Sequence, residues 1–462
     1  MRFLALIVAA TALATACAAD QSSDSRPEEA STIPPLPPGQ VQDFGEPPEL
    51  RAGPLAPEVV SAIAQVFGPS LEDGFFDVDD RSAFDTMGAS GDVRVAWLLS
   101  DLLRFVSGED TRPRIARAAS DVMGRDLDGD WRAVTDHLIA WDVPAPPNYF
   151  AHKKLLYTLV SPAWEPFFDE TSTVDWRLIS WGGVFIDDQP FNETSGDCQR
   201  CIPAIDNPIV TDAAGGGWYP DERVVFGVEI NGEARAYPKH IMEIRELVND
   251  SLGERDFGMP YCTLCGAAQV FFTDEVDGFD RPILRTSGLL SRSNKVMFDL
   301  NTKSVFDTFL GEAVTGPLAD AGVVLPQANV VTTTWGAWKA EHPNTTILAE
   351  ELDLGRGFDP LRGRDDDGPI FPIGEVDSRL PAQEKVLGVI SPETGQAIAF
   401  HVVSAVAFLA NGETIDIDGI SIVSSGSGVE AVNAEGDDLG GHEAFWFAWS
   451  QFNPATQLWP PS

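Results

Sequence analysis

The chain has 462 residues, of which 71 are Asp or Glu and 31 are Lys or Arg, so its formal net charge is −40. Such a surface repels phosphate backbones and anionic headgroups, which argues against nucleic-acid binding and against a basic membrane-binding patch. Since 44% of the residues are hydrophobic, the length predicts two or three domains, each with a core of its own.

Residues 1–17 have the features of an export signal. Arg2 precedes an apolar run from Phe3 to Ala16, which is too short to span a bilayer and ends in small residues before Cys17. The segment 13–17, Leu-Ala-Thr-Ala-Cys, resembles a lipobox, in which the cysteine is acylated. We therefore expect lipidation at Cys17 and an extracytoplasmic protein anchored to a membrane, in the periplasm or at the cell surface. Ordinary secretion with cleavage nearby is the alternative.

Two segments follow before the chain changes character. Residues 18–50 are rich in Pro, Ser and Glu, a composition that predicts a disordered tether. Residues 55–175 place apolar residues three and four positions apart, notably over 92–106, 114–123 and 131–141. This spacing predicts short antiparallel helices that form a small, repeat-like helical domain.

From about residue 176 the pattern is that of β-structure. The run 224–230 is followed by Asn231-Gly232 and a returning segment 233–237. Asn-Gly is a strong hairpin signal, because both residues of the turn take positive φ. A similar hairpin is predicted for 386–400, with a slightly longer turn that contains Gly395.

The two predicted hairpins belong to a longer internal similarity. Trp335-Gly-Ala-Trp338 is followed by His342-Pro343 and Thr345, and Trp446-Phe-Ala-Trp449 is followed at the same spacing by Asn453-Pro454 and Thr456. We infer a duplication that covers about 222–350 and 384–460. The expected fold class is therefore α+β, with an N-terminal all-helical, repeat-like domain, a first β-rich repeat at 176–350 and a shorter second one at 351–462. The first copy has extra residues, mostly from Tyr261 to Pro317, and we expect a site there.

That extra region contains a C-x-x-C motif, Cys262 and Cys265, followed by Gly266. A second pair, Cys198 and Cys201, precedes it. The two pairs could form one Cys₄ metal site, could form structural disulfides, or could include a redox-active dithiol at Cys262 and Cys265. Zinc and copper are the candidate metals.

Three further observations bear on these alternatives. A redox-active pair usually lies at the amino terminus of a helix, but the segment 268–272 downstream of Cys265 has the pattern of a strand. His240 and His342 are possible additional ligands, although nothing in their spacing selects them. The sequence therefore leaves the three roles of the cysteines open.

Several motifs in a fixed order resemble a known family. They are Trp181-Gly-Gly-Val184, Ile202 to Pro208, Gly227-Val228 with Ala234 to Pro238, Val248-Asn-Asp250, Tyr261 to Gly266, Ser287-Gly-Leu-Leu290, Thr334-Trp-Gly336 and His342-Pro343. Together they resemble the bacterial domain-of-unknown-function family 3179 over about 176–460. Arg245-Glu246 stands where that family's pattern has histidine and glutamate, and Cys198 and Cys201 lie in an apparent insertion.

The resemblance implies no established activity, and the residues leave two functions open. The first is an exported lipoprotein that binds metal or exchanges thiols through its C-x-x-C turn. The second is a non-enzymatic lipoprotein that binds a protein partner or a small ligand and has purely structural cysteines. The sequence does not decide whether the protein is an enzyme.

Overall fold

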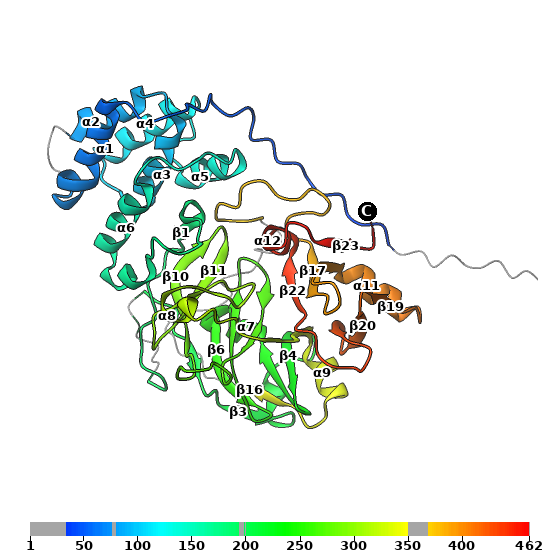
Figure 1. Ribbon diagram of the computed structural model, residues 1–462. Coiled ribbons are helices and arrows are strands. Elements are labelled where there is room, and N and C mark those ends of the chain that lie inside the picture. Colours follow the sequence, from blue (N-terminus) through cyan, green and yellow to red (C-terminus); the bar gives the residue numbers. More distant parts are fainter. Residues whose placement is uncertain (1–33, 76–79, 194–197, 199, 350–367, 462) are drawn as a thin grey trace, which may run out of the picture. The chain divides into compact units, whose positions relative to one another are not determined.

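The computed structural model describes residues 34–75, 80–193, 198, 200–349 and 368–461. The expected signal segment with Cys17, and the start of the expected tether, lie outside the described residues. Residues 34–50 contain no helix or strand and run as an extended segment toward the first helices (Figure 1). Leu36 packs against a hydrophobic cluster around Trp446, and Phe44 lies edge-on to His137 at 5.2 Å between ring centroids. This half of the expected tether is therefore held against the folded body.

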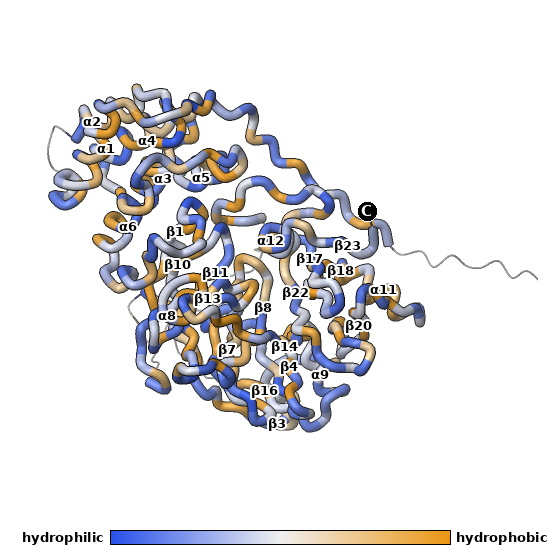
Figure 2. The backbone as a smooth tube through the Cα atoms, in the orientation of Figure 1, coloured by the Kyte–Doolittle hydropathy of each residue, from blue (hydrophilic) through white to orange (hydrophobic). Residues whose placement is uncertain are grey.

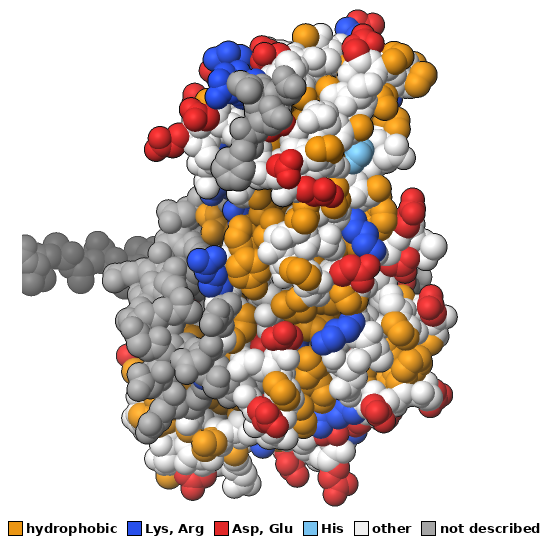
Figure 3. Space-filling model, turned by 90° about the vertical axis from the view of Figure 1, so that its left-hand side faces the viewer, with side chains coloured by type: hydrophobic (Ala, Val, Ile, Leu, Met, Phe, Trp, Pro, Cys, Tyr) orange, Lys and Arg blue, Asp and Glu red, His pale blue; other side chains and the backbone are white. Residues whose placement is uncertain are grey.

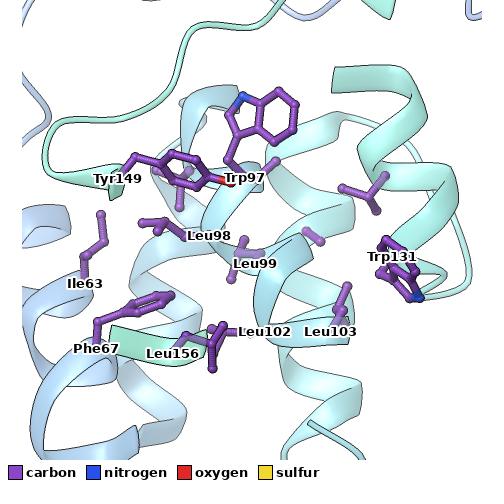
Figure 4. Close-up of a cluster of buried hydrophobic side chains, with 14 of the residues drawn as sticks. Ile63, Phe67, Trp97, Leu98, Leu99, Leu102, Leu103, Trp131, Tyr149 and Leu156 are labelled. Atoms are coloured by element: carbon purple, nitrogen blue, oxygen red, sulfur yellow. The ribbon is translucent and has the colours of Figure 1, made fainter. Parts of the chain in front are cut away.

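The helical part agrees with the predicted pattern. Its helices are α1 (Pro57–Gln65), α2 (Asp80–Ala89), α3 (Ala96–Phe105), α4 (Arg112–Met123), α5 (Trp131–Ala140) and α6 (Tyr149–Val160). The Asp130 carboxylate caps α5 by accepting from the Arg132 amide, and Gly124 ends α4 in the left-handed conformation. α3 is the central helix, because every residue from Ala96 to Leu103 is buried. Figure 4 shows its side chains surrounded by Ile63, Phe67, Trp131, Tyr149 and Leu156.

No helix in the described ranges combines the length and the apolar character that a membrane span requires.

The β-rich part contains five sheets within the described residues. The first, in spatial order, is β1 (Ile179–Trp181), β10 (Leu284–Ser291), β11 (Asn294–Asp299), β12 (Val305–Phe306) and β13 (Ala313–Thr315). The second is β14 (Gln327–Ala328), β9 (Val270–Phe272), β7 (Arg255–Cys262), β6 (Leu247–Leu252) and β2 (Ile205–Asp206), with β8 (Ala267–Ala268) beside β7. Hydrophobic residues concentrate in the strands around β7 (Figure 2), where Phe257, Met259 and Val270 are buried.

Three more sheets complete this part. The third is β15 (Val331–Thr334), β4 (Val224–Ile230), β5 (Glu233–Pro238), β16 (Thr346–Leu348) and β3 (Val210–Asp212). The fourth is β22 (His442–Phe445), β17 (Lys385–Ile390), β18 (Ala397–His401) and β23 (Gln457–Trp459), and the fifth is β19 (Ile415–Ile417), β20 (Ile420–Ser425) and β21 (Gly428–Val432). The helices of this part are α7 (Lys239–Arg245), α8 (Gly316–Asp320), α9 (Trp335–Glu341), α11 (Val402–Ala410) and α12 (Trp446–Phe452). The α+β class is confirmed.

Both predicted hairpins are present. β4 and β5 pair antiparallel around Asn231 and Gly232, which have φ of +52° and +81°. β17 and β18 pair antiparallel, and Gly395 in their turn has φ of +69°. The positive φ values of Asn231 and Gly232 are those predicted for an Asn-Gly turn.

The third and fourth sheets have the same local arrangement. In each, the hairpin is flanked by an antiparallel strand on one side and by a parallel strand on the other: β15 and β16 in the third sheet, β22 and β23 in the fourth. A helix follows the second hairpin strand, and another follows the antiparallel neighbour. Trp338 and Trp449 each donate their indole N–H to a threonine hydroxyl, of Thr345 and Thr456 respectively, at 2.9 Å. The segment from Tyr261 to Pro317, in which the sequence predicts a site, runs from the end of β7 through β8 to β13 into the start of α8.

Candidate functional site

The C-x-x-C motif forms the turn between two antiparallel strands. Cys262 is the last residue of β7 and pairs with Ala267 of β8, while the Cys265 amide donates to the Cys262 carbonyl at 3.2 Å. Gly266 has φ of +62°, and a side chain there would meet the ring of Phe445 at 2.9 Å. The segment 268–272, predicted as one strand, is divided between the end of β8 and β9, and the two cysteines lie in a tight β-turn.

The two sulfur atoms are close together, buried and not bonded to each other. Their Sγ atoms are 2.9 Å apart, and the side chains are 2% and 0% exposed. The Lys295 amide donates to Cys262 Sγ at 3.4 Å, and the Cys265 thiol lies 3.2 Å from Asn294 Oδ1 and 3.5 Å from the Ser293 carbonyl. Ser293, in the loop before β11, and Asn294 and Lys295, the first two residues of β11, therefore supply polar partners for both sulfurs.

These surroundings make the two thiols unequal. Burial by itself raises the pKa of Cys262, but the hydrogen bond with Cys265, the Lys295 amide and the Lys295 charge together lower that pKa below its ordinary value. The pKa of Cys265 is well above its ordinary value, because of burial and of the neighbouring Cys262. Cys262 is therefore the sulfur that carries the negative charge when the pair loses a proton.

An ion pair between the buried Lys295 and the partly buried Glu246 lies beside the thiols. Lys295 Nζ is 2.6 Å from Glu246 Oε2 and also donates to the Glu246 carbonyl at 2.9 Å. The Thr263 hydroxyl donates to the other carboxylate oxygen at 3.4 Å. Glu246 follows α7 in the left-handed conformation, with φ of +54°, an uncommon backbone state for a side chain of this size. The Glu246 carboxylate thus connects the end of α7 with the C-x-x-C turn and with β11.

A cavity of about 150 Å³ opens next to this ion pair. Glu246, Thr263, Thr286 and Lys295 contribute its polar lining. The remaining lining includes the apolar side chains Val184, Ile202, Leu264, Leu289, Leu290 and Phe371. Because the two residues between the cysteines, Thr263 and Leu264, both line this cavity, a small molecule bound in it would lie beside the thiol turn.

The second half of the chain covers the other side of the turn. The Phe445 amide of β22 donates to the Cys265 carbonyl at 2.7 Å. Cys262 and Cys265 share a hydrophobic cluster with Val386, Ala444 and Trp446, which all belong to the second half. The thiols therefore lie where the two β-rich halves meet.

The second cysteine pair has a different role. Cys198 and Cys201 form a disulfide with each other. Cys201 Sγ lies 3.8 Å from Asp187 Oδ1. A bridged pair has no thiolate to give to a metal ion, so the single Cys₄ site weighed from the sequence is not formed in this structure.

Neither of the suggested histidine ligands is engaged with the cysteines. His240 stacks on Tyr219 at 5.3 Å between ring centroids, and burial lowers its pKa. His342 lies against Trp338 at 4.0 Å, and its Nδ1 is 3.1 Å from Glu229 Oε2. Within the described part of the chain, no three His, Cys, Asp or Glu side chains gather in a way that could hold a metal ion.

Sequence reasoning missed the residues that surround the sulfurs. Asn294 and Lys295 are separated from the C-x-x-C motif by the strands β8 to β10 and their connecting loops, and no spacing rule links them to it. The sequence singles out Glu246 only through its neighbour Arg245, which stands where the family's pattern has histidine. A signal was available, because the Ser287 to Leu290 motif lies just before Asn294 and Lys295 in the hairpin β10–β11.

The fold and the site define an α+β protein with a buried dithiol turn between two β-rich halves. A family model described as a protein of unknown function, DUF3179, matches residues 199–415. The segment 199–415 therefore belongs to this family, which the motifs indicated over about 176–460. No curated protein and no solved structure matched the chain.

Proposed function

We propose that this protein is an exported, membrane-anchored lipoprotein in which Cys262 and Cys265 form a redox-active dithiol. The observation that carries the proposal is the pair of unbonded sulfurs 2.9 Å apart. A disulfide needs about 2.05 Å between the sulfurs, so a small rotation of the side chains suffices to close the bond. The unequal pKa values of the two thiols provide the asymmetry that such chemistry uses.

The reaction is thiol–disulfide exchange with a substrate disulfide. The Cys262 thiolate attacks one substrate sulfur, a Cys262–substrate bond forms, and the other substrate sulfur leaves as a thiolate, which takes up a proton. Cys265 then loses its proton and attacks Cys262 Sγ, so the second substrate thiolate leaves. The protein dithiol is oxidised by two electrons to a disulfide, and the substrate disulfide is reduced to two thiols. The reverse sequence oxidises a dithiol substrate.

The surroundings limit the substrate. Both sulfurs are buried, and the neighbouring cavity of about 150 Å³ is lined mainly by apolar side chains. These dimensions favour a low-molecular-weight disulfide over one within a folded protein. Lys295 acts as a positioning residue, because its amide and its charge both favour the Cys262 thiolate.

Metal binding is the competing role for the same pair, with zinc or copper as the ion. The donor set fits such an ion poorly. Two thiolates on one tetrahedral zinc ion lie roughly 3.7 Å apart, given Zn–S bonds of about 2.3 Å, whereas these sulfurs are 2.9 Å apart. Asn294 Oδ1 and the Ser293 carbonyl are weak additional ligands for a thiophilic ion.

Thiol counting and metal analysis on protein purified without a metal-affinity tag test the proposal. In a series of buffers from reducing to oxidising, the thiols of Cys262 and Cys265 should be lost together and should return together on reduction. The double variant Cys198→Ser/Cys201→Ser should behave in the same way. In Cys265→Ser, the mixed disulfide between Cys262 and one half of a small disulfide should remain trapped. Thiols that stay reduced under oxidising conditions contradict the proposal. Stoichiometric zinc or copper that is bound by the wild-type protein and absent from Cys262→Ser supports the metal site instead. A permanent bridge without exchange supports the non-enzymatic, ligand-binding alternative.

The anchoring half of the proposal rests on the segment that ends at Cys17. Labelling of growing cells with a clickable fatty acid should mark the full-length protein, and Cys17→Ala should remove the label and release the protein from the membrane fraction. Labelling that is unchanged in Cys17→Ala contradicts the lipid anchor.

We also propose that the third and fourth sheets descend from one duplicated unit, and that the helical part is repeat-like. The matching strand order and the two Trp–Thr hydrogen bonds support the duplication. So do the close contacts of the Trp338 ring with Gly227 and of the Trp449 ring with Gly388. The short helices α1 to α6 are compatible with a repeat-like domain. Under this proposal the extra strands of the first copy supply the thiol turn, and the second copy covers it.

A further inference from the structure

The helix α11 presents an uncharged, apolar face at the surface of the second β-rich half. No Asp, Glu, Lys or Arg occurs in 395–412, and Ser404 is the one hydroxyl residue of the helix. Ser404 and Ala405 are buried, whereas Val403 is 58% exposed. The partly buried apolar residues of the helix include Val402, Val406, Phe408 and Leu409. A surface helix normally turns charged or polar side chains to water, so this outer face is of the kind that contacts another apolar surface.

This face continues to the C-terminal end of the chain. Phe408 lies edge-on to Trp459 at 5.5 Å between ring centroids. The next two residues, Pro460 and Pro461, line a second, open cavity of about 790 Å³, together with Pro34 to Gly39. Figure 1 shows α11, the C-terminal end and the start of the extended segment on the same side of the molecule. Residues from three distant parts of the sequence thus form one surface.

This surface carries little charge in an otherwise acidic protein. Besides 395–412, the segments 30–42 and 444–461 contain no Asp, Glu, Lys or Arg, although the chain has 71 acidic residues. Arg379 is the one charged residue among the described residues that line the open cavity, and it is paired with Asp377 at 2.7 Å. Figure 3 shows the side that faces away from α11, where Asp and Glu side chains are spread from the helical part to the sheets. An apolar or zwitterionic partner therefore fits the uncharged side.

The extended segment that begins at Pro34 is held against the body at separate points. A side chain on Gly39 would overlap the carbonyl oxygen of Ser378, and Arg125 donates to the Phe44 carbonyl at 2.7 Å. These contacts fix the place at which the preceding residues join the body. That place lies within the uncharged surface, since Pro34 lines the open cavity.

The expected lipid anchor would keep this side of the body near the membrane. Sixteen residues, 18–33, separate Cys17 from Pro34. A chain of that length reaches at most about 55 Å when fully extended, and with the flexibility that its composition predicts it spans roughly 25 Å on average. A folded body of this size has a diameter of roughly 55 Å. The surface around Pro34 therefore meets the lipid far more often than the opposite side does.

We propose that α11, Trp459 and the proline segments 34–38 and 460–461 form a face that rests on the headgroup region of the membrane to which Cys17 is anchored. The apolar side chains of α11 enter that region, and tryptophan is a residue type enriched there. Zwitterionic headgroups suit this face, because the net negative charge of the protein is repelled by anionic ones. The inference rests on the lipid anchor of the proposed function and is independent of the redox role of the thiol turn.

Hydrogen exchange of the lipidated protein in phosphatidylcholine vesicles tests this face. The reference is the lipid-free chain that begins at residue 18, in the same buffer. Exchange in 402–410 and 456–459 should be slower on the vesicles by about two- to tenfold, because lipid displaces water there. The segments 57–65 and 316–324, which lie on the opposite side in Figure 1, should exchange as in the reference.

A charge placed on α11 provides the matched variant. Val403→Glu should lose most of the protection in 402–410, whereas Val324→Glu, at a position that is also 58% exposed, should keep it. Both variants should retain the fatty-acid label.

The label separates failure of the face from failure of the anchor. A labelled protein without protection in 402–410 overturns the membrane-facing surface and leaves the anchor standing, whereas a protein that takes up no fatty acid overturns both. Dimers of the lipid-free chain that Val403→Glu disperses would show that the face joins two copies instead, which also overturns the proposal.

Discussion

The indole ring of Trp449 lies against the backbone of Gly388 so closely that a side chain on Gly388 would overlap it, and Trp338 lies in the same way against Gly227. The two glycines are the central residues of β4 and β17 in the paired hairpins, opposite Ala236 and Ala399. Each tryptophan thereby joins the helix that carries it to its sheet.

This contact predicts the effect of adding a methyl group. Gly227→Ala and Gly388→Ala should each lower the free energy of unfolding by about 1–3 kcal/mol, because the ring must move to make room. Urea unfolding monitored by tryptophan fluorescence measures the loss. Gly217→Ala is the matched control, since a side chain there would meet nothing within 4 Å. Equal stability of Gly388→Ala and Gly217→Ala would contradict the packing described.

The unequal pKa values of the thiols predict unequal reactivity. In the reduced protein, iodoacetamide should modify Cys262 before Cys265 at every pH, since the pKa of Cys262 is below its ordinary value and that of Cys265 is above it. Peptide mass spectrometry after short exposures from pH 6 to pH 10 measures both rates. Preferential modification of Cys265 would refute the assignment of the thiolate.

Removing the Lys295 charge should move the reactivity profile of Cys262. Lys295→Met keeps the amide that donates to Cys262 Sγ but removes the cation, so the apparent pKa of Cys262 should rise and its modification should shift to higher pH. Lys339→Met, at a surface ion pair with Asp221, serves as the control and should leave the profile unchanged. An unchanged profile in Lys295→Met would show that the amide and Cys265 alone stabilise the thiolate.

The carboxyl of Glu430 predicts a loss of stability with rising pH. Burial, then repulsion by Asp438, Glu341 and Glu229, raises its pKa to about 7. The folded state therefore holds the proton more tightly than the unfolded state, and stability falls as the pH rises from about 5 through 7. Glu430→Gln should stabilise the protein by about 1–2 kcal/mol at pH 8, allowing for solvent screening, and change little at pH 5.

Thermal or urea unfolding between pH 5 and pH 8.5 measures this difference. The exposed residue Glu435 provides the control, Glu435→Gln. A stability gain that is the same at pH 5 and pH 8 would mean that titration of Glu430 is not its cause.

The Cys198–Cys201 bridge should contribute to stability without affecting the thiol turn. Its loop is short, since the cysteines are 3 positions apart, and the chain-entropy relation for so small a loop gives about 2 kcal/mol. The variant Cys198→Ser/Cys201→Ser should lose this amount in urea unfolding, while the alkylation profile of Cys262 stays the same. A changed profile would indicate that the two cysteine pairs are coupled.

Some elements could be predicted because their signals are local. The Asn231-Gly232 turn, the helices α3 to α5 and the strand after Cys265 each follow from a few neighbouring residues, through backbone preference or the period of apolar positions. The matched Trp-to-Thr spacing in the two halves was also visible, because one short segment carries both the ring and its hydrogen-bond partner.

The amino-acid sequence by itself thus determined the family, the α+β class, the hairpins and the presence of a C-x-x-C turn. The tertiary structure alone decided that Cys198 pairs with Cys201, that Lys295 and Asn294 reach the sulfurs of Cys262 and Cys265, and that β22 covers their turn. The reason is that a local signal depends on neighbouring residues, whereas the partners of a buried side chain depend on how distant strands pack. The pKa values and the two cavities arise from that packing, so no spacing in the chain could predict them.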